Sequence, residues 1–146
     1  MHPVLQSAKA EFTAPNVTFL PADTSYREVY AQSNCVITDY SSAVFDFAYL
    51  QKPILYAQFD QKRFFSGEHS CVKGDFFDYE RDGFGKVTTT LEDTLDALTE
   101  ILAADCQMDA FYIQRLHQAF PALDQSNSNR IYTHCQQFLK RSSIRA

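Results

Sequence analysis

Two short apolar runs on either side of an amphipathic segment constrain the fold of this chain more than any other feature. Residues 35–38 and residues 53–57 each have the length and composition of a buried strand. Between them, residues 41–50 space their apolar side chains so that these share one face of a helix. Strands that alternate with helices in this way pair in parallel through right-handed crossovers, so the sequence predicts an α/β fold.

The segments on either side extend this pattern. Residues 1–5 and 17–20 have the character of further strands, and a capping box, Ser25 to Glu28, predicts the start of a helix before residue 35. Residues 58–86 contain all four glycines and are too long for an ordinary connection, which indicates a functional loop.

The C-terminal part of the chain is predicted to be helical. A second capping box, Thr89 to Glu92, precedes a helix with a stripe of four leucines, Leu91, Leu95, Leu98 and Leu102. Two more helices are expected, near residues 109–119 and 127–140. The length of 146 residues predicts one domain over residues 1–146, in which residues 120–146 form a C-terminal helix with a basic tail.

The charge balance argues against one class of partner. The chain carries 13 Lys and Arg residues against 18 Asp and Glu residues, a net charge of -5, whereas a nucleic-acid binder needs a basic face. No acidic residue lies in residues 126–146, which hold four basic ones, Arg130, Lys140, Arg141 and Arg145. We therefore expect no nucleic-acid partner, and the basic tail is the one electrostatic asymmetry.

The sequence also lacks the signals of several other classes. No run of about 18 apolar residues is present, and the N-terminus lacks the basic-then-apolar order of a secretory signal. The cysteines, Cys35, Cys71, Cys106 and Cys135, are widely spaced and contain no CxxC pair, which is typical of reduced thiols. No P-loop, GxGxxG, HExxH, GxSxG or calcium-loop pattern occurs. We expect a cytoplasmic protein that uses no metal and no cofactor.

The most informative local feature is the stretch Thr38-Asp39-Tyr40-Ser41-Ser42, where the run at 35–38 ends. In an open parallel sheet, ligands bind outside the carboxyl ends of the strands, where this stretch falls. Free backbone amides, a helix N-terminus and two Ser hydroxyls together suit an anion such as phosphate. A helix cap at Asp39 or Ser41 explains the same residues equally well, and the two roles are compatible.

Two more side chains are candidates for this site. Asp46 lies four residues after Ser42, so its carboxylate could receive ribose or polyol hydroxyls, although a solvated helix acid gives the same pattern. His2 stands at the end of the expected first strand and could donate to a phosphoryl oxygen or act as a general acid. A structural histidine or a frayed terminus is the alternative for His2.

An ordered set of short motifs resembles one known family. In chain order the motifs are His2-Pro3, Thr38-Asp39-Tyr40-Ser41-Ser42, Phe45-Asp46-Phe47, Lys52-Pro53, Phe59-Asp60 and Phe77-Asp78-Tyr79-Glu80. This set is similar to that of the CDP-glycerol glycerophosphotransferase family, whose members build or prime teichoic acids and related capsular polymers. The order of the motifs is far more specific than any one of them.

The resemblance implies a fold and a set of roles. Its fold would be the Rossmann-like, doubly wound parallel sheet with helices on both faces that forms the C-terminal, donor-binding half of a GT-B fold. His2 would contact the donor phosphates as the catalytic histidine, Ser41 and Ser42 would bind the diphosphate, and Thr38, Asp39 and Asp46 would complete the donor site. The donor would be CDP-glycerol or a similar CDP-activated molecule, and the acceptor a polymer or lipid-linked hydroxyl. The resemblance also implies that the protein is a peripheral membrane protein at the inner face of the cell membrane.

Two alternatives remain open at this point. The first is a GT-B glycosyltransferase with a nucleotide-sugar donor, or a relative that uses CDP-ribitol. The second is a non-catalytic α/β module whose basic tail docks on an anionic membrane or on a partner protein.

Overall fold

The computed structural model describes residues 14–21, 23–68 and 77–143. The chain divides into two compact units, Met1–Asn34 and Cys35–Ala146. The described part of the first unit contains one helix, α1 (Tyr26–Gln32), and the predicted cap is confirmed because the Ser25 side chain accepts a hydrogen bond from the Glu28 amide. The predicted strand at residues 17–20 is wrong: this run has no strand partner in the described part of the chain, and Val17 and Leu20 are exposed.

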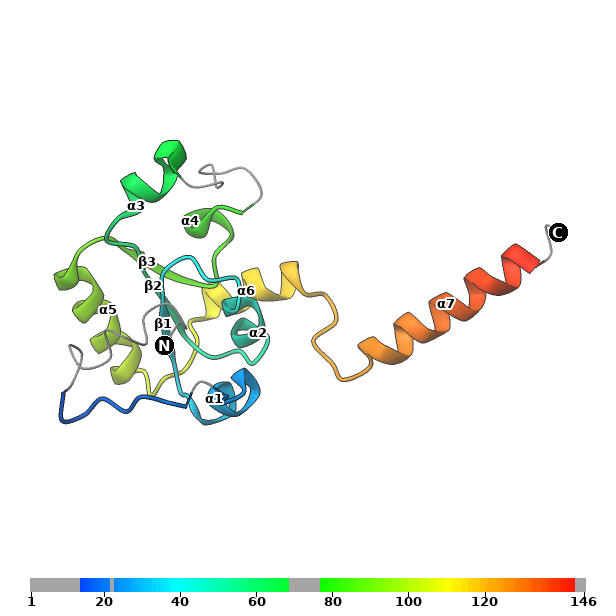
Figure 1. Ribbon diagram of the computed structural model, residues 1–146, viewed down its shortest axis with the longest axis horizontal. Helices are drawn as coiled ribbons and strands as arrows, with labels where there is room; N and C mark the ends of the chain where they lie inside the picture. Colours follow the sequence, from blue (N-terminus) through cyan, green and yellow to red (C-terminus); the bar gives the residue numbers. More distant parts are fainter. Residues whose placement is uncertain (1–13, 22, 69–76, 144–146) are drawn as a thin grey trace. The chain divides into compact units, whose positions relative to one another are not determined.

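The second unit is built on a parallel sheet, as predicted. Its strands are β1 (Val36–Thr38), β2 (Ile54–Ala57) and β3 (Gly85–Thr88), in the order β1-β2-β3. Both neighbouring pairs are parallel, and Thr38, Tyr56 and Val87 lie in register across the sheet. All three strands therefore present their carboxyl ends at one edge, which is the upper edge in Figure 1.

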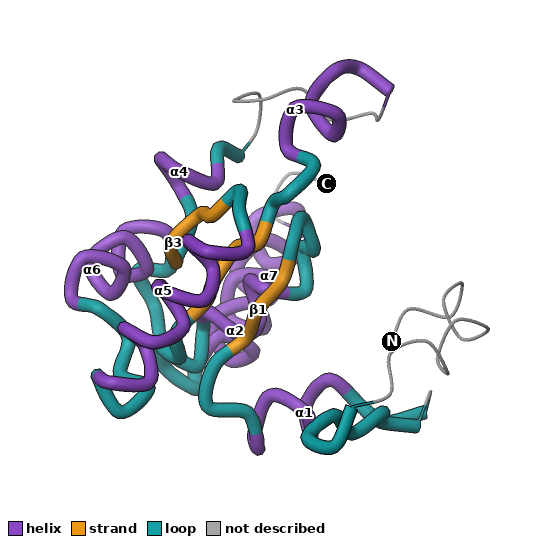
Figure 2. The backbone as a smooth tube through the Cα atoms, turned by 90° about the vertical axis from the view of Figure 1, so that its left-hand side faces the viewer, coloured by secondary structure: helices purple, strands orange, loops and turns teal. Residues whose placement is uncertain are grey.

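Helices cover both faces of this sheet. The helix α2 (Val44–Ala48) connects β1 to β2 and contacts both strands, and α5 (Leu91–Ala103) contacts β2 and β3. Figures 1 and 2 show α2 and α5 on opposite sides of the sheet. Two helices complete the unit, α6 (Ala110–Ala119) and α7 (Asn127–Ser143).

The core lies around the central strand. Ile54, Leu55 and Tyr56 of β2 are all buried, as expected for a strand covered on both faces. Phe47 of α2 is fully buried as well, and so is Leu116 of α6. The apolar spacing of residues 41–50 predicted a buried face of Val44, Phe45, Ala48 and Tyr49. Val44 and Ala48 are buried and the other two are half-buried, whereas the fully buried Phe47 was not predicted. The helix is also shorter than that range.

The segment expected to be one long loop holds three short helices and a strand. In residues 58–86 the chain forms α3 (Gln61–Arg63), the π-helical turn η2 (Phe64–Glu68), α4 (Tyr79–Asp82) and the start of β3. Figures 1 and 2 place α3 and α4 beyond the carboxyl ends of the strands. The chain thus brings this segment to the edge of the sheet where the candidate site was predicted.

Two details of α5 differ from the prediction. Its N-cap is Thr90, whose side chain accepts from the Asp93 amide, one residue beyond the predicted cap at Thr89. The buried face consists of Thr94 and Ala97, whereas the predicted leucine stripe is largely exposed: Leu91, Leu95 and Leu102. Small side chains allow the helix to approach the sheet closely, which turns the larger leucines outward.

Candidate functional site

The candidate site is the turn between β1 and α2, residues 39–43, which we call the serine turn. The Asp39 carboxylate accepts from the Tyr40 amide at 2.6 Å, and Ser41 Oγ accepts from the Ala43 amide at 3.3 Å. Ser41 and Ser42 are exposed, and among the described residues their backbone amides have no acceptor. Two hydroxyls and two amides of adjacent residues are therefore available to an anion at the carboxyl end of β1.

Two side chains from other segments hold the backbone of the serine turn. Gln58, fully buried just after β2, donates from Nε2 to the Asp39 carbonyl at 3.2 Å. The Tyr79 hydroxyl, from the first residue of α4, donates to the Tyr40 carbonyl at 3.0 Å. Two successive carbonyls of the turn are thus fixed from β2 and from α4.

The Tyr40 side chain ties the turn to the segment after β2. Its hydroxyl donates to Asp60 Oδ1 at 2.9 Å, and its ring stacks on Phe64 with a centroid distance of 3.5 Å. Burial and the hydrogen bond to Asp60 raise the pKa of the Tyr40 hydroxyl above its ordinary value. Tyr40 therefore stays neutral and keeps its donor role through the physiological pH range.

The aspartates around α4 explain how Tyr79 is positioned. Asp78 is the N-cap of α4, and its Oδ1 accepts from the amides of Glu80 and Arg81. Asp82 Oδ2 accepts in return from the Asp78 amide at 2.9 Å. These bonds fix both ends of the short helix α4, so its first residue, Tyr79, holds its hydroxyl toward the serine turn.

A cavity of about 510 Å³ lies beside the turn, at the carboxyl ends of β2 and β3. Its lining includes Gln58 and Asp60, which both bond to the turn, together with Lys62, Arg63 and Thr89. Lys62 and Arg63 give this cavity two cationic side chains, which suit an anionic ligand. A second cavity of about 350 Å³ lies elsewhere, lined mainly by α5, the segment before α6 and the start of α6.

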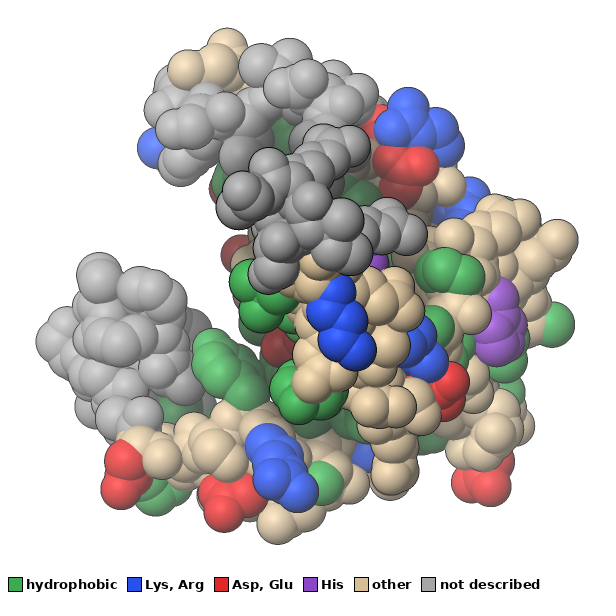
Figure 3. All heavy atoms as spheres, turned by 90° about the vertical axis from the view of Figure 1, so that its right-hand side faces the viewer, with side chains coloured by type: hydrophobic (Ala, Val, Ile, Leu, Met, Phe, Trp, Pro, Cys, Tyr) green, Lys and Arg blue, Asp and Glu red, His purple; other side chains and the backbone are tan. Residues whose placement is uncertain are grey.

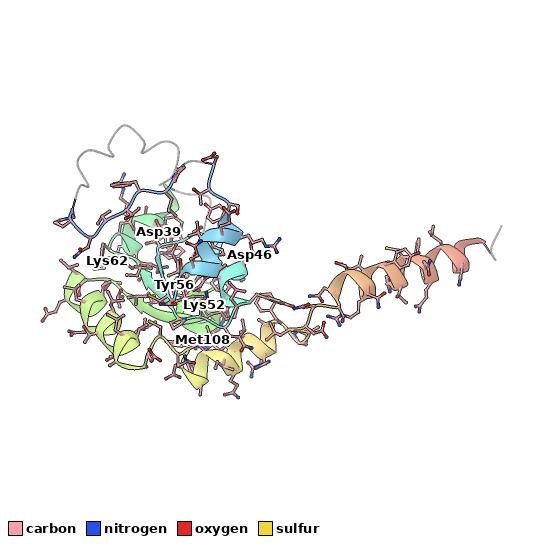
Figure 4. The ribbon with its side chains drawn as sticks, turned by 90° about the horizontal axis from the view of Figure 1, so that it is seen from below. Asp39, Asp46, Lys52, Tyr56, Lys62 and Met108 are labelled. Carbon is pink, nitrogen blue, oxygen red and sulfur yellow. The ribbon has the colours of Figure 1, made fainter. Side chains whose placement is uncertain are left out.

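The structure brings most of the predicted site residues together. Thr38 is the last residue of β1, and Asp39, Ser41 and Ser42 follow it in the serine turn. Asp46 is exposed on α2, where Figure 4 labels it, and no hydrogen bond or ion pair connects it to the turn within the described residues. His2 lies outside the described residues.

Sequence reasoning missed the residues that support the turn. Asp60 and Tyr79 stood in the motif set, but without a role, and Gln58 carried no signal because nothing distinguishes a buried glutamine from a surface one in sequence.

In the described part of the chain, no three His, Cys, Asp or Glu side chains are grouped so that they could hold a metal ion.

Comparison with known proteins identifies the family. Residues 1–136 match the family model of CDP-glycerol:poly(glycerophosphate) glycerophosphotransferases, and the chain belongs to this family. It is 33% identical over 132 residues to the minor teichoic acid biosynthesis protein GgaB of Bacillus subtilis (strain 168). It is 35% identical over 82 residues to the teichoic acid poly(glycerol phosphate) polymerase of the same strain. These matches cover 90% and 56% of this chain, but the chain spans only 14% and 10% of the length of the two relatives.

A solved structure supports the fold. The wall teichoic acid polymerase TagF matches 79% of this chain with a TM-score of 0.55 and 24% sequence identity, over 27% of the polymerase chain. A second structure of TagF gives a TM-score of 0.51 over the same shares. The parallel sheet with its covering helices is therefore an arrangement that also occurs in this polymerase.

Proposed function

We propose that this chain forms the donor-binding part of a glycerophosphotransferase, the C-terminal half of a GT-B fold with a doubly wound sheet. The observation that carries the proposal is the serine turn, where two hydroxyls and two uncommitted amides meet at the carboxyl edge of a parallel sheet. A diphosphate needs several donors in a small space, and the cationic side chains of Lys62 and Arg63 line the neighbouring cavity.

The reaction in this proposal transfers glycerol phosphate from CDP-glycerol to a hydroxyl of a polymer or lipid-linked acceptor. The acceptor oxygen attacks the β-phosphorus in line, the bond from this phosphorus to the bridging oxygen breaks, and CMP leaves while the acceptor hydroxyl loses its proton. Ser41, Ser42 and their amides hold the diphosphate and offset its growing negative charge. Thr38 and Asp39 shape the turn, Asp46 receives a polyol or ribose hydroxyl, and His2 protonates or stabilises the departing CMP.

Calorimetric titration tests the donor site. We expect CMP and CDP-glycerol to bind the 146-residue chain, and the variant Ser41→Ala/Ser42→Ala to lose at least about tenfold in affinity because it lacks two hydroxyl donors. Ser126→Ala/Ser128→Ala, which changes two exposed serines at the start of α7, is the matched control and should bind as the wild type does. Equal affinity of the turn variant and the control would show that the donor does not bind at the serine turn.

The same titration decides between donors. CDP-ribitol is included because a relative of this family would prefer it, and a nucleotide-sugar such as a UDP-hexose because a GT-B glycosyltransferase would prefer that. Tighter binding of the nucleotide-sugar than of both CDP-polyols would replace the glycerophosphotransferase proposal with the glycosyltransferase one. We expect the chain alone to bind its donor without turnover, and polymerisation of glycerol phosphate by these 146 residues would refute that expectation.

A second candidate function, attachment to an anionic membrane, is favoured by α7. Its apolar residues Ile131, Tyr132, Phe138 and Leu139 are between 62% and 66% exposed and fall within one arc of the helix. Figure 3 looks from the α7 side and shows hydrophobic side chains beside Lys and Arg side chains on this face. No helix in the described ranges has the length and apolar character needed to cross a bilayer. A helix of this kind would lie in the membrane surface and keep a transferase peripheral at the inner face of the cell membrane.

Vesicle co-sedimentation tests this candidate. We expect the chain to bind vesicles rich in phosphatidylglycerol more than neutral ones, and Ile131→Ser/Phe138→Ser to remove that binding because it breaks the apolar arc. Ser41→Ala/Ser42→Ala is the control and should bind vesicles as the wild type does. A chain that stays in the supernatant with anionic vesicles would rule out attachment through α7.

A further inference from the structure

The hydrogen bond from the Tyr79 hydroxyl to the Tyr40 carbonyl has a geometric consequence for the serine turn. A trans peptide unit is planar, and its C=O and N–H point in opposite directions. The Tyr40 carbonyl shares its peptide unit with the Ser41 amide. Because Tyr79 draws this carbonyl toward α4 at 3.0 Å, the Ser41 N–H must point away from α4.

The same reasoning extends to the amide that follows. The Ser41 carbonyl accepts from the Val44 amide at 3.4 Å, where α2 begins, so the Ser42 N–H points away from the first turn of α2. On the other side, Gln58 fixes the Asp39 carbonyl, and the Tyr40 amide is taken by the Asp39 carboxylate. The amides of Ser41 and Ser42 are therefore the pair that the turn leaves for a ligand.

The position of Tyr79 is itself well determined. Its ring packs edge-on against Tyr40, Tyr56 and Phe77, with centroid distances between 5.1 and 5.8 Å. The Asp78 cap fixes the backbone of the residue. A Phe in its place would keep the ring contacts and lose only the hydroxyl.

We infer that Tyr79 is a positioning residue for phosphate binding, because its hydroxyl sets the direction of the Ser41 amide. Although Tyr79 lies 39 residues beyond Tyr40 in the sequence, α4 thereby controls the affinity of the serine turn for the phosphate of the donor. This inference rests on the proposed donor site. Tyr79 itself touches no phosphate, so its loss should lower affinity for ligands that carry phosphate and leave the affinity for the nucleoside unchanged.

The test compares Tyr79→Phe with Tyr56→Phe in the ¹⁵N-labelled 146-residue chain, with CMP and cytidine as ligands. Tyr56 is a matched control because it is buried, its ring packs against Tyr79, and its hydroxyl accepts from the Phe84 amide instead of reaching the turn. Titrations followed by amide resonances give both the affinity and the residues that respond.

We expect CMP, but not cytidine, to move the Ser41 amide resonance of the wild type downfield. Tyr79→Phe should lower the affinity for CMP about five- to tenfold, the effect of misdirecting one charge-assisted hydrogen bond, with cytidine unaffected. In the ligand-free state this variant should displace the Ser41 and Ser42 resonances, and Tyr56→Phe should leave both the resonances and CMP binding close to those of the wild type.

The outcomes separate the inference from the function on which it rests. Unchanged CMP affinity in Tyr79→Phe overturns the inference while the donor site stands. An equal loss in Tyr79→Phe and Tyr56→Phe also overturns it, because the effect would then be a general loss of packing. If the wild type responds equally to CMP and cytidine, the donor site at the serine turn is wrong and the inference falls with it.

Discussion

Gln58 offers the clearest test of how the serine turn is stabilised. Its side chain is fully buried and makes two hydrogen bonds: Nε2 donates to the Asp39 carbonyl, and Oε1 accepts from Gln61 Nε2 at 3.1 Å. The substitution Gln58→Leu keeps nearly the same volume and removes both. The Asp39 carbonyl then loses its protein donor, and the Gln61 side chain loses the acceptor of its Nε2 group.

The expected cost follows from these two bonds. Each contributes about 0.5–1.5 kcal/mol to the free energy of unfolding, so Gln58→Leu should destabilise the protein by about 1–3 kcal/mol. A loss near the middle of this range, about 2 kcal/mol, lowers the melting temperature of a domain of this size by roughly 5–10 °C. Gln61→Leu breaks only the second bond and should cost about half as much.

Urea unfolding followed by far-ultraviolet circular dichroism measures this loss, since the chain has no Trp for fluorescence. Gln114→Leu, at an exposed position of α6, is the matched control and should change the free energy of unfolding by less than about 0.5 kcal/mol. Wild-type stability in Gln58→Leu would refute the reasoning. So would an equal loss in Gln58→Leu and Gln61→Leu, because the bond to Asp39 would then contribute nothing.

Three further predictions concern α4, the sheet and the thiols. The hydrogen bond from Arg81 lowers the pKa of Asp82 from 3.8 to about 2. The contribution of the Asp82 carboxylate to stability is therefore complete above about pH 4 and is lost as the pH falls through 2. Asp82→Asn should flatten this part of a profile of stability against pH. In Gly85→Ala the new Cβ would collide with the Ile54 carbonyl of the neighbouring strand. We therefore expect insoluble or unfolded protein, measured by soluble yield and circular dichroism. A melting curve like that of the wild type would contradict the close approach of the two strands. Burial raises the pKa of the Cys35 thiol, so iodoacetamide at pH 8 should modify the exposed Cys135 before it modifies Cys35. A mass-spectrometric time course measures the order, and modification of Cys35 before Cys135 would contradict the burial of Cys35.

The fold was predictable where burial on both faces leaves a continuous apolar run. Residues 35–38 and 53–57 were predicted as strands for this reason, and they contain β1 and β2. β3 was missed because its four residues include one glycine and one lysine and show no apolar run. Residues 17–20 show the opposite error, since an apolar run alone does not provide a strand partner.

The candidate site was predictable only in part, because a sequence shows which residues follow a strand but not which distant side chains reach them. The serine turn was found from its position after the first apolar run of the α/β pattern. Gln58 and Tyr79, which hold its carbonyls, lie 19 and 39 residues from their acceptors, and no local pattern relates residues so far apart.

The structure gives a physical reason why three of the motifs occur together. Asp60 of the Phe59-Asp60 pair accepts from Tyr40, and Tyr79 of the Phe77–Glu80 stretch donates to the carbonyl of the same residue. Asp78 of that stretch caps the helix that carries Tyr79. These two motifs therefore both act on Tyr40, whose carbonyl shares a peptide unit with the Ser41 amide, so a change in either of them should alter the direction of this amide before it alters the fold.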